Sequence, residues 1–190
     1  MNITEAKEIL DPTFGFTVGD TDSVIQKLNL PEDAKILDVG TGVGNLAITL
    51  ALNGYRVLTG EPADDDTIYA KQAWHENAKK VSVDHLIEFR AFDAKDMPFE
   101  DNTFDAIFFL GSFHHVEENS RDKVLQDCAR ISKPGALVCF FEPNQDCIKI
   151  ISELDPTHPE VADPNDHVRG LNLESQKIEG TMFDAFIFKK

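Results

Sequence analysis

The chain has few basic residues, few cysteines and no long hydrophobic run. Its 190 residues contain 18 Lys and Arg against 34 Asp and Glu, a formal net charge of −16 at pH 7. Such a surface repels phosphate backbones and anionic lipid headgroups, and no basic cluster in the sequence offsets it. We therefore expect no nucleic-acid partner and no membrane partner.

The three cysteines, Cys128, Cys139 and Cys147, are odd in number and have no Cys-x-x-Cys spacing. A disulfide framework and a zinc ribbon are therefore not expected, and reduced thiols are. No stretch approaches the ~18 apolar residues that are typical of a membrane span. The first ten residues carry charges in place of the apolar run of a signal peptide. These absences predict a cytoplasmic protein.

What is present is enough apolar sequence, 42% of the residues, to form one hydrophobic core. Apolar runs that are typical of buried strands lie at residues 35–39, 56–59, 86–91, 104–110 and 136–141. Helices are expected between them at 46–52, from Asp64-Asp65-Asp66 to Lys79-Lys80, and from Ser120 to the stop signal at 133–135. This alternation predicts a largely parallel α/β sheet with helices on both faces.

The segments outside this alternation are harder to interpret. Residues 1–30 are typical of a helical lead-in that contains a turn at 11–15. Residues 153–170 contain three prolines and are expected to be irregular, whereas 177–190 alternate enough to predict a closing hairpin.

The strongest motif, residues 36–45 (ILDVGTGVGN), lies at the first strand-to-helix turn. Its glycines let a ligand approach the backbone, and the following helix offers unpaired N–H groups. A nicotinamide site has its third glycine at the position of Asn45, whereas this chain has glycine at 44. Asp38 suits a ligand with an amino group or a cation.

Two further acids follow the next two strands. Glu61 is placed to accept both hydroxyls of a ribose. Asp93 is placed to accept from the exocyclic amine of an adenine, with backbone groups near Ala94 completing the contact. The fourth strand runs into residues 111–115, at the sheet edge where open α/β folds bind ligands.

In this order the motifs resemble those of class I S-adenosylmethionine-dependent methyltransferases of the small-molecule, type 11-like group. The matching segments are residues 38–44, Glu61, 92–94 with 97–99, 104–106 and 130–135. The resemblance implies a Rossmann-like sheet of seven strands, mostly parallel, with an antiparallel last strand. It implies S-adenosylmethionine as cofactor and methyl donor, bound by Asp38, Gly40, Thr41, Gly42, Gly44, Asn45, Glu61, Asp93, Ala94 and Gly111.

The resemblance covers about residues 30–142 and predicts a single methyltransferase domain over 1–190. Within it, 1–30 form a helical lead-in and possible lid, 31–142 the cofactor-binding core, and 143–190 a short acceptor-side segment with closing strands. That segment has no recognisable acceptor domain, so we expect a small-molecule acceptor whose identity the sequence does not give. No feature indicates an oligomeric state. Pro62 after the ribose acid departs from the family pattern.

His114 and His115 are the candidate catalytic residues, as general base or acceptor-positioning groups, although one can equally be structural. Methyl transfer needs mainly in-line approach, so a protein base is not obligatory. The acids and histidines of 155–167 match no metal-site spacing and are interpreted as a solvated loop, so no metal is expected. Two alternatives remain: a non-catalytic S-adenosylmethionine-binding regulator, and a nicotinamide-dependent oxidoreductase, which the absence of a Tyr-x-x-x-Lys pair disfavours.

Overall fold

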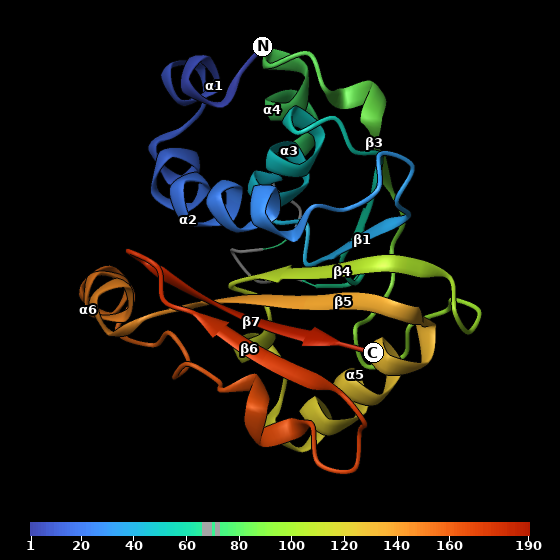
Figure 1. The fold of residues 1–190 in the computed structure, drawn as a ribbon. Coiled ribbons are helices and arrows are strands. Elements are labelled where there is room, and N and C mark those ends of the chain that lie inside the picture. Colours follow the sequence, from blue (N-terminus) through green and yellow to red (C-terminus); the bar gives the residue numbers. More distant parts are fainter. Residues whose placement is uncertain (66–69, 71–72) are drawn as a thin grey trace.

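A computed structural model describes residues 1–65, 70 and 73–190 of the chain. Its centre is one sheet with the strand order β3-β2-β1-β4-β5-β7-β6 (Figure 1). Strands β1 to β5 pair in parallel, and β7 runs antiparallel to both β5 and β6. The strands are β1 (Ile36–Val39), β2 (Val57–Gly60), β3 (Ile87–Phe89), β4 (Phe104–Leu110), β5 (Ser132–Pro143), β6 (Glu174–Ile178) and β7 (Phe183–Lys189). The seven strands, the antiparallel last strand and the closing hairpin confirm the predicted fold.

Helices cover both faces of this sheet. Helices α1 to α4 lie on one side and α5 on the other, as Figure 1 shows. The helices are α1 (Ile3–Ile9), α2 (Pro12–Leu28), α3 (Asn45–Leu52), α4 (Trp74–Lys80), α5 (Glu118–Ile131) and α6 (Gln145–Leu154). Single 3₁₀ turns form η1 (Asp84–Leu86), η2 (Phe113–His115) and η3 (Pro164–His167).

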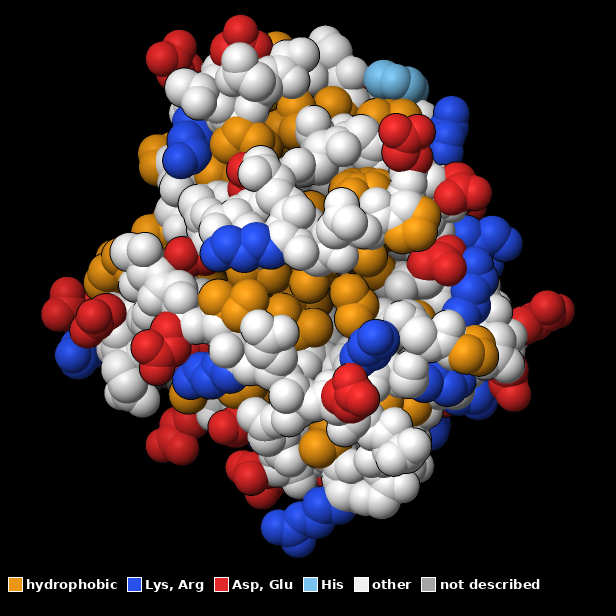
Figure 2. Space-filling model, in the orientation of Figure 1, with side chains coloured by type: hydrophobic (Ala, Val, Ile, Leu, Met, Phe, Trp, Pro, Cys, Tyr) orange, Lys and Arg blue, Asp and Glu red, His pale blue; other side chains and the backbone are white. Residues whose placement is uncertain are grey.

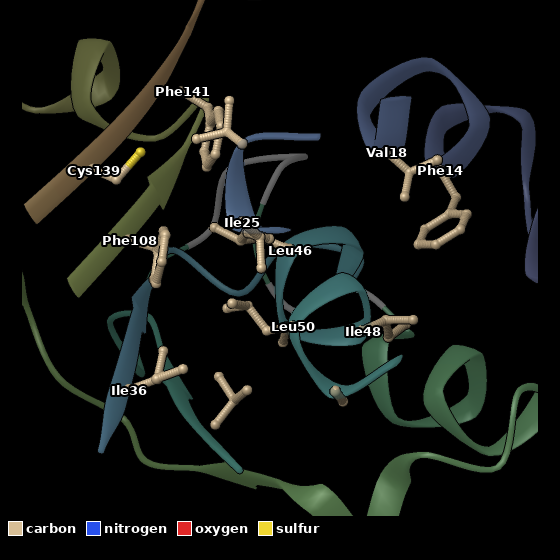
Figure 3. Packing of buried hydrophobic residues seen from close by; sticks show 14 of the residues in the cluster. Phe14, Val18, Ile25, Ile36, Leu46, Ile48, Leu50, Phe108, Cys139 and Phe141 are labelled. Atoms are coloured by element: carbon tan, nitrogen blue, oxygen red, sulfur yellow. The ribbon is translucent and has the colours of Figure 1, made fainter. Parts of the chain in front are cut away.

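The core has two layers because neighbouring residues of a strand point to opposite faces. Phe108 and Phe141 pack with residues of α2 and α3 in one cluster (Figure 3). Phe109 and Phe140, one position away, pack with α5 in the other cluster. All four phenylalanines are buried, and Cys128, Cys139 and Cys147 are buried free thiols.

The start of α4 was predicted wrongly. The helix begins at Trp74, whereas Asp64 lies in a turn, Asp65 has no regular structure and Asp66 falls outside the described residues. Consecutive aspartates favour a helix start, but aspartate also favours turns, and here the turn forms. The predicted end at Lys79-Lys80 is confirmed.

The bounds of α5 also differ from the prediction. Glu117 is the N-cap, so Ser120 lies inside the first turn and does not cap the helix. The helix ends at Ile131, and the expected stop signal at 133–135 forms the start of β5 instead. A register shift between Phe104 and Ala106 accommodates this irregular start, a tertiary pairing that local propensity does not encode.

The expected turn at residues 11–15 is the first turn of α2. Asp11 caps that helix by accepting from the Thr13 N–H (2.9 Å), and Pro12 occupies the first position. Phe14 is buried in the core, and Phe16 packs edge-to-face on Phe183 with centroids 6.1 Å apart. Figure 2 shows hydrophobic side chains gathered between α2 and β7. A lid role for residues 1–30 stays a prediction.

Helix α6 was not predicted. Asn144 caps it by accepting from the N–H groups of Asp146 and Cys147 at 3.1 and 3.0 Å. The Asn144 amide also donates to the carbonyl oxygens of Gly180 and Thr181, which ties the helix start to the β6–β7 turn. The rest of 155–170 is irregular apart from η3, as expected.

Candidate functional site

The predicted site residues converge because the carboxyl ends of parallel strands meet at one edge of the sheet. Asp38 in β1 is in register with Thr59 in β2 and with Phe108 in β4. The loops that follow these strands therefore begin side by side. This placement brings together the glycine loop, Glu61 and the Gly111 turn.

The glycine loop is held in a conformation that side chains disfavour. Gly40, Gly42 and Gly44 have φ values of +96°, +49° and +88°. Gly40 donates to the Gly60 carbonyl oxygen (2.9 Å), and Gly44 donates to the Thr41 carbonyl oxygen (2.8 Å). Helix α3 then begins at Asn45, and no side chain of the described residues caps it, so its first N–H groups are available to an anionic ligand group.

Asp38 is fully buried at the base of this loop. Its Oδ2 accepts from the Thr59 hydroxyl at 2.8 Å, and the Thr59 and Thr41 hydroxyl oxygens lie 2.9 Å apart. Its Oδ1 has no hydrogen-bond partner among the described residues. Desolvation raises the pKa of Asp38 to about 8, and the nearby charge of Glu61 adds to this against the lowering effect of the Thr59 hydrogen bond.

This raised pKa predicts a specific pH dependence of stability. Between pH 4 and 8 the folded protein keeps a proton on Asp38 that the unfolded chain loses, so the free energy of unfolding falls as pH rises. We expect Asp38→Asn to remove this contribution, which is at most about 1.4 kcal/mol per pH unit. Urea unfolding of both proteins at pH 5, 6.5 and 8 measures the difference. Parallel pH profiles for the two proteins would contradict the assignment.

Glu61 follows β2 and closes over the glycine loop. Glu61 is buried, with 8% of its surface exposed, and its Oε2 accepts from the Gly42 N–H at 3.0 Å. The Glu61 carbonyl oxygen accepts from the Phe92 N–H (3.2 Å), which holds the next loop alongside. The predicted ribose acid thus bridges the loops after β1 and β3.

Asp93 and Ala94 lie in the turn that follows β3. Asp93 Oδ1 accepts from the Lys95 N–H at 2.8 Å, and Lys95 Nζ lies 3.6 Å from Oδ2. Both residues are partly exposed beside the segment that carries Glu61. The Phe92–Glu61 backbone hydrogen bond sets this turn beside the segment that carries Glu61, and its role in binding an adenine stays a prediction.

The turn after β4 packs directly on the glycine loop. Gly111, with φ +57°, donates to the Phe141 carbonyl oxygen at 2.8 Å. The Ser112 hydroxyl donates to the Val39 carbonyl oxygen at 2.7 Å, and a Cβ placed on Gly40 would lie 2.6 Å from the Ser112 Cβ. Ser112 therefore sets how closely the two loops approach, a role that the sequence did not indicate.

The two predicted catalytic histidines have different surroundings. His114 is buried, and its Nδ1 lies 2.6 Å from Oε2 of the equally buried Glu142 at the end of β5. His115 is exposed, yet partial desolvation and repulsion from His114 and His158 lower its pKa to about 4. His114 is thus held by Glu142, whereas His115 lies against the His114 and His158 rings and is neutral at physiological pH.

Sequence reasoning missed Thr59, Ser112 and Glu142 and left His158 in a solvated loop. Glu142 carried a signal, because it is an acid that ends a long apolar strand run. No feature of the sequence around His158 indicated that it lies at the carboxyl edge of the sheet. The candidate metal group at 155–167 is dispersed: Asp163 caps η3, and His167 Nδ1 lies 2.7 Å from Asp122 Oδ1.

The sheet order and the glycine loop define a Rossmann-like nucleotide-binding fold of the methyltransferase type. A family model described as "Methyltransferase domain" matches residues 37–140, more than half of the chain. The chain belongs to this methyltransferase domain family. The family and the motif spacing favour the methyltransferase interpretation over the nicotinamide alternative.

Curated relatives share part of their length with this chain. It is 30% identical over 115 residues to 27-O-demethylrifamycin SV methyltransferase from Amycolatopsis mediterranei, covering 60% of this chain and 40% of that protein. It is 32% identical over 121 residues to sterol 4-C-methyltransferase strm-1 from Caenorhabditis elegans, covering 63% and 34%. The chain thus spans less than half the length of these two relatives.

Solved structures share the fold along most of the chain. A SAM-dependent methyltransferase from Aquifex aeolicus matches with a TM-score of 0.67 at 19% identity, covering 100% of this chain and 98% of that one. The PH0226 protein from Pyrococcus horikoshii matches with a TM-score of 0.73 at 19% identity, covering 95% and 92%. Among the described residues, no helix combines the length and the apolar character needed to span a membrane.

Proposed function

We propose that this chain binds S-adenosylmethionine and transfers its methyl group to a small-molecule acceptor. One observation carries the proposal: a family-matched glycine loop is hydrogen-bonded to Glu61 and underlain by Asp38, a buried acid with an unpartnered oxygen. A buried carboxyl oxygen with no partner among the described residues suits an ammonium group, which supplies both a hydrogen bond and a compensating charge.

The donor would extend along the rim, from the glycine loop to the Asp93 turn. Asp38 would hold the amino group of the donor's methionine part. The N-terminus of α3, at Asn45, would face the carboxylate of the same part. Glu61 would accept from the ribose hydroxyls, and Asp93 with the Ala94 backbone would bind the adenine edge. The methyl group would then face the Gly111 turn.

Transfer would be an in-line displacement on the methyl carbon. A bond forms between the acceptor atom and this carbon, the carbon–sulfur bond breaks, and its electron pair stays on sulfur as S-adenosylhomocysteine. His114 and His115, in η2, would then lie at the acceptor side, where they would orient the acceptor or take its proton. Residues 1–30 and 153–170 are the segments proposed to close over it.

A small acceptor agrees with the names of the relatives, which act on a rifamycin, a sterol or, in Actinopolyspora halophila, glycine and its methylated forms. The net charge of −16 argues against a nucleic-acid acceptor. The three buried free thiols support a reducing, cytoplasmic location.

Calorimetry of the full chain tests the donor assignment. We expect S-adenosylhomocysteine to bind with a stoichiometry of one and NAD⁺ to show no measurable heat under the same conditions. The reason is that Asn45 replaces the glycine that a pyrophosphate needs. Equal affinity for both ligands, or preference for NAD⁺, would overturn the proposal.

A non-catalytic S-adenosylmethionine-binding role is the second candidate, because the chain covers only 40% and 34% of the two relatives described above. Both roles predict binding of the donor. Formation of S-adenosylhomocysteine from S-adenosylmethionine across an acceptor library separates them, because only an enzyme shows acceptor-dependent turnover.

A further inference from the structure

Three histidine rings from two distant segments meet at the acceptor side of the rim. His114 and His115 belong to η2, and His158 lies in the segment after α6. The ring centroids are 4.4 Å apart for His114–His115, 5.0 Å for His114–His158 and 5.1 Å for His115–His158. Ring nitrogens of all three lie within 4.8 Å of one another, the one such group of metal-ligating side chains found in the described part of the chain.

His114 presents a buried nitrogen that no described residue satisfies. Its side chain is 2% exposed, and Nε2 has no hydrogen-bond partner within residues 1–65, 70 and 73–190. The other nitrogen, Nδ1, is held by Glu142 Oε2 at 2.6 Å. A histidine that donates one N–H to a carboxylate and keeps its other nitrogen buried beside two further imidazoles has the arrangement of a metal ligand.

His158 is fixed in the same tautomer by a different acceptor. Its Nδ1 lies 2.9 Å from the Pro159 carbonyl oxygen, which can only accept, so Nδ1 carries the proton and Nε2 the lone pair. Backbone carbonyls and carboxylates are the two common outer partners of metal-binding histidines. The cluster contains one of each.

We propose that His114, His115 and His158 bind a divalent transition-metal ion of the Zn²⁺ class. Imidazole nitrogens are preferred ligands of such ions and bind Zn²⁺ at about 2.0–2.1 Å, which puts tetrahedral ligand atoms about 3.4 Å apart. The present nitrogen separations, all within 4.8 Å, would have to shorten by about 1 Å to reach this value. Rotation of the exposed His115 and the half-buried His158 side chains would bring the nitrogens together.

The charges around the cluster favour a cation. Asp65 and Asp155 both act electrostatically on His115, and Asp155 and Glu142 act on His158. These carboxylates offset the charge that a dication would bring to a partly buried position.

Three protein ligands with a fourth position open are typical of catalytic zinc sites, whereas structural sites are closed by four. A Cβ on Gly111 would lie 3.9 Å from the His114 ring, so the cluster adjoins the turn that packs on the glycine loop. The open position would therefore face the acceptor, and a bound metal would orient it in place of a free His114 or His115 base; this consequence rests on the proposed function. Metal binding itself does not depend on it.

Metal titration of the full chain, stripped with chelator, tests the site. We expect one Co²⁺ per chain, with the visible absorption of a low-symmetry nitrogen site, and its displacement by one equivalent of Zn²⁺. Glu142→Gln should weaken Zn²⁺ binding by about 10- to 100-fold, because it removes only the outer partner of His114. His158→Ala removes a ligand and should weaken binding by more than about 100-fold.

The matched control is His85→Ala, because His85 is an exposed histidine of η1 outside the cluster. It should bind Zn²⁺ as the unaltered chain does. Equal affinity of His158→Ala and His85→Ala, or no binding by the unaltered chain, would overturn the site and indicate adventitious surface binding only. Circular dichroism and S-adenosylhomocysteine calorimetry on each variant keep this result separate from loss of folding and from failure of the proposed donor site.

Discussion

Gly40→Ala is expected to lower the free energy of unfolding by about 2–5 kcal/mol and to abolish tight S-adenosylhomocysteine binding. About 1–2 kcal/mol comes from forcing a side chain into the left-handed region at φ +96°. About 1–3 kcal/mol comes from overpacking, because the new Cβ would lie 2.6 Å from the Ser112 Cβ and 2.9 Å from its hydroxyl. Relief of this clash moves the loop that is proposed to hold the donor.

Gly54→Ala is the matched control for this prediction. Gly54 has nearly the same φ, +92°, but apart from its two chain neighbours no described residue has an atom within 4 Å of a Cβ placed there. Its cost should be limited to the backbone term of about 1–2 kcal/mol, with ligand affinity unchanged. Urea unfolding and calorimetry measure both effects, and Ser112→Gly combined with Gly40→Ala should recover part of the loss. Equal destabilisation by Gly40→Ala and Gly54→Ala would show that the contact with Ser112 is unimportant.

Glu61→Ala is expected to weaken S-adenosylhomocysteine binding by about 10- to 150-fold. Loss of a hydrogen bond to a charged group typically costs about 1.5–3 kcal/mol, which corresponds to this range. Glu61 has two roles here, since its Oε2 also holds the Gly42 N–H at 3.0 Å in the described structure. Isothermal titration calorimetry measures the change in affinity.

Two controls separate these roles. Glu61→Gln keeps an oxygen that can accept from Gly42 but loses the charge, so we expect a smaller loss of affinity than for alanine. Glu174→Ala removes an exposed acid of β6, at the far edge of the sheet, and should leave binding unchanged. A folded Glu61→Ala variant with unaltered affinity would rule out the ribose assignment.

The order of strands and helices followed from periodicity and spacing because these signals are local. β4 was predicted with its observed bounds, since seven consecutive residues suited to a buried strand leave few alternatives. Helix bounds were less predictable. The start of α5 depends on Arg121, whose guanidinium donates to the carbonyl oxygens of Val116 and His114 at 3.0 Å and ties the first turn to η2.

The sequence by itself determined the parallel sheet, the glycine loop and the positions of Asp38, Glu61 and Asp93, because strand-end residues of a parallel sheet must share one edge. Only the tertiary structure decided what surrounds them. The pairing of β5 with β4 carries Glu142 to His114, and the irregular segment after α6 returns His158 to the same place. Spacing along the chain does not encode such contacts, because a loop of irregular backbone has no fixed direction until it packs.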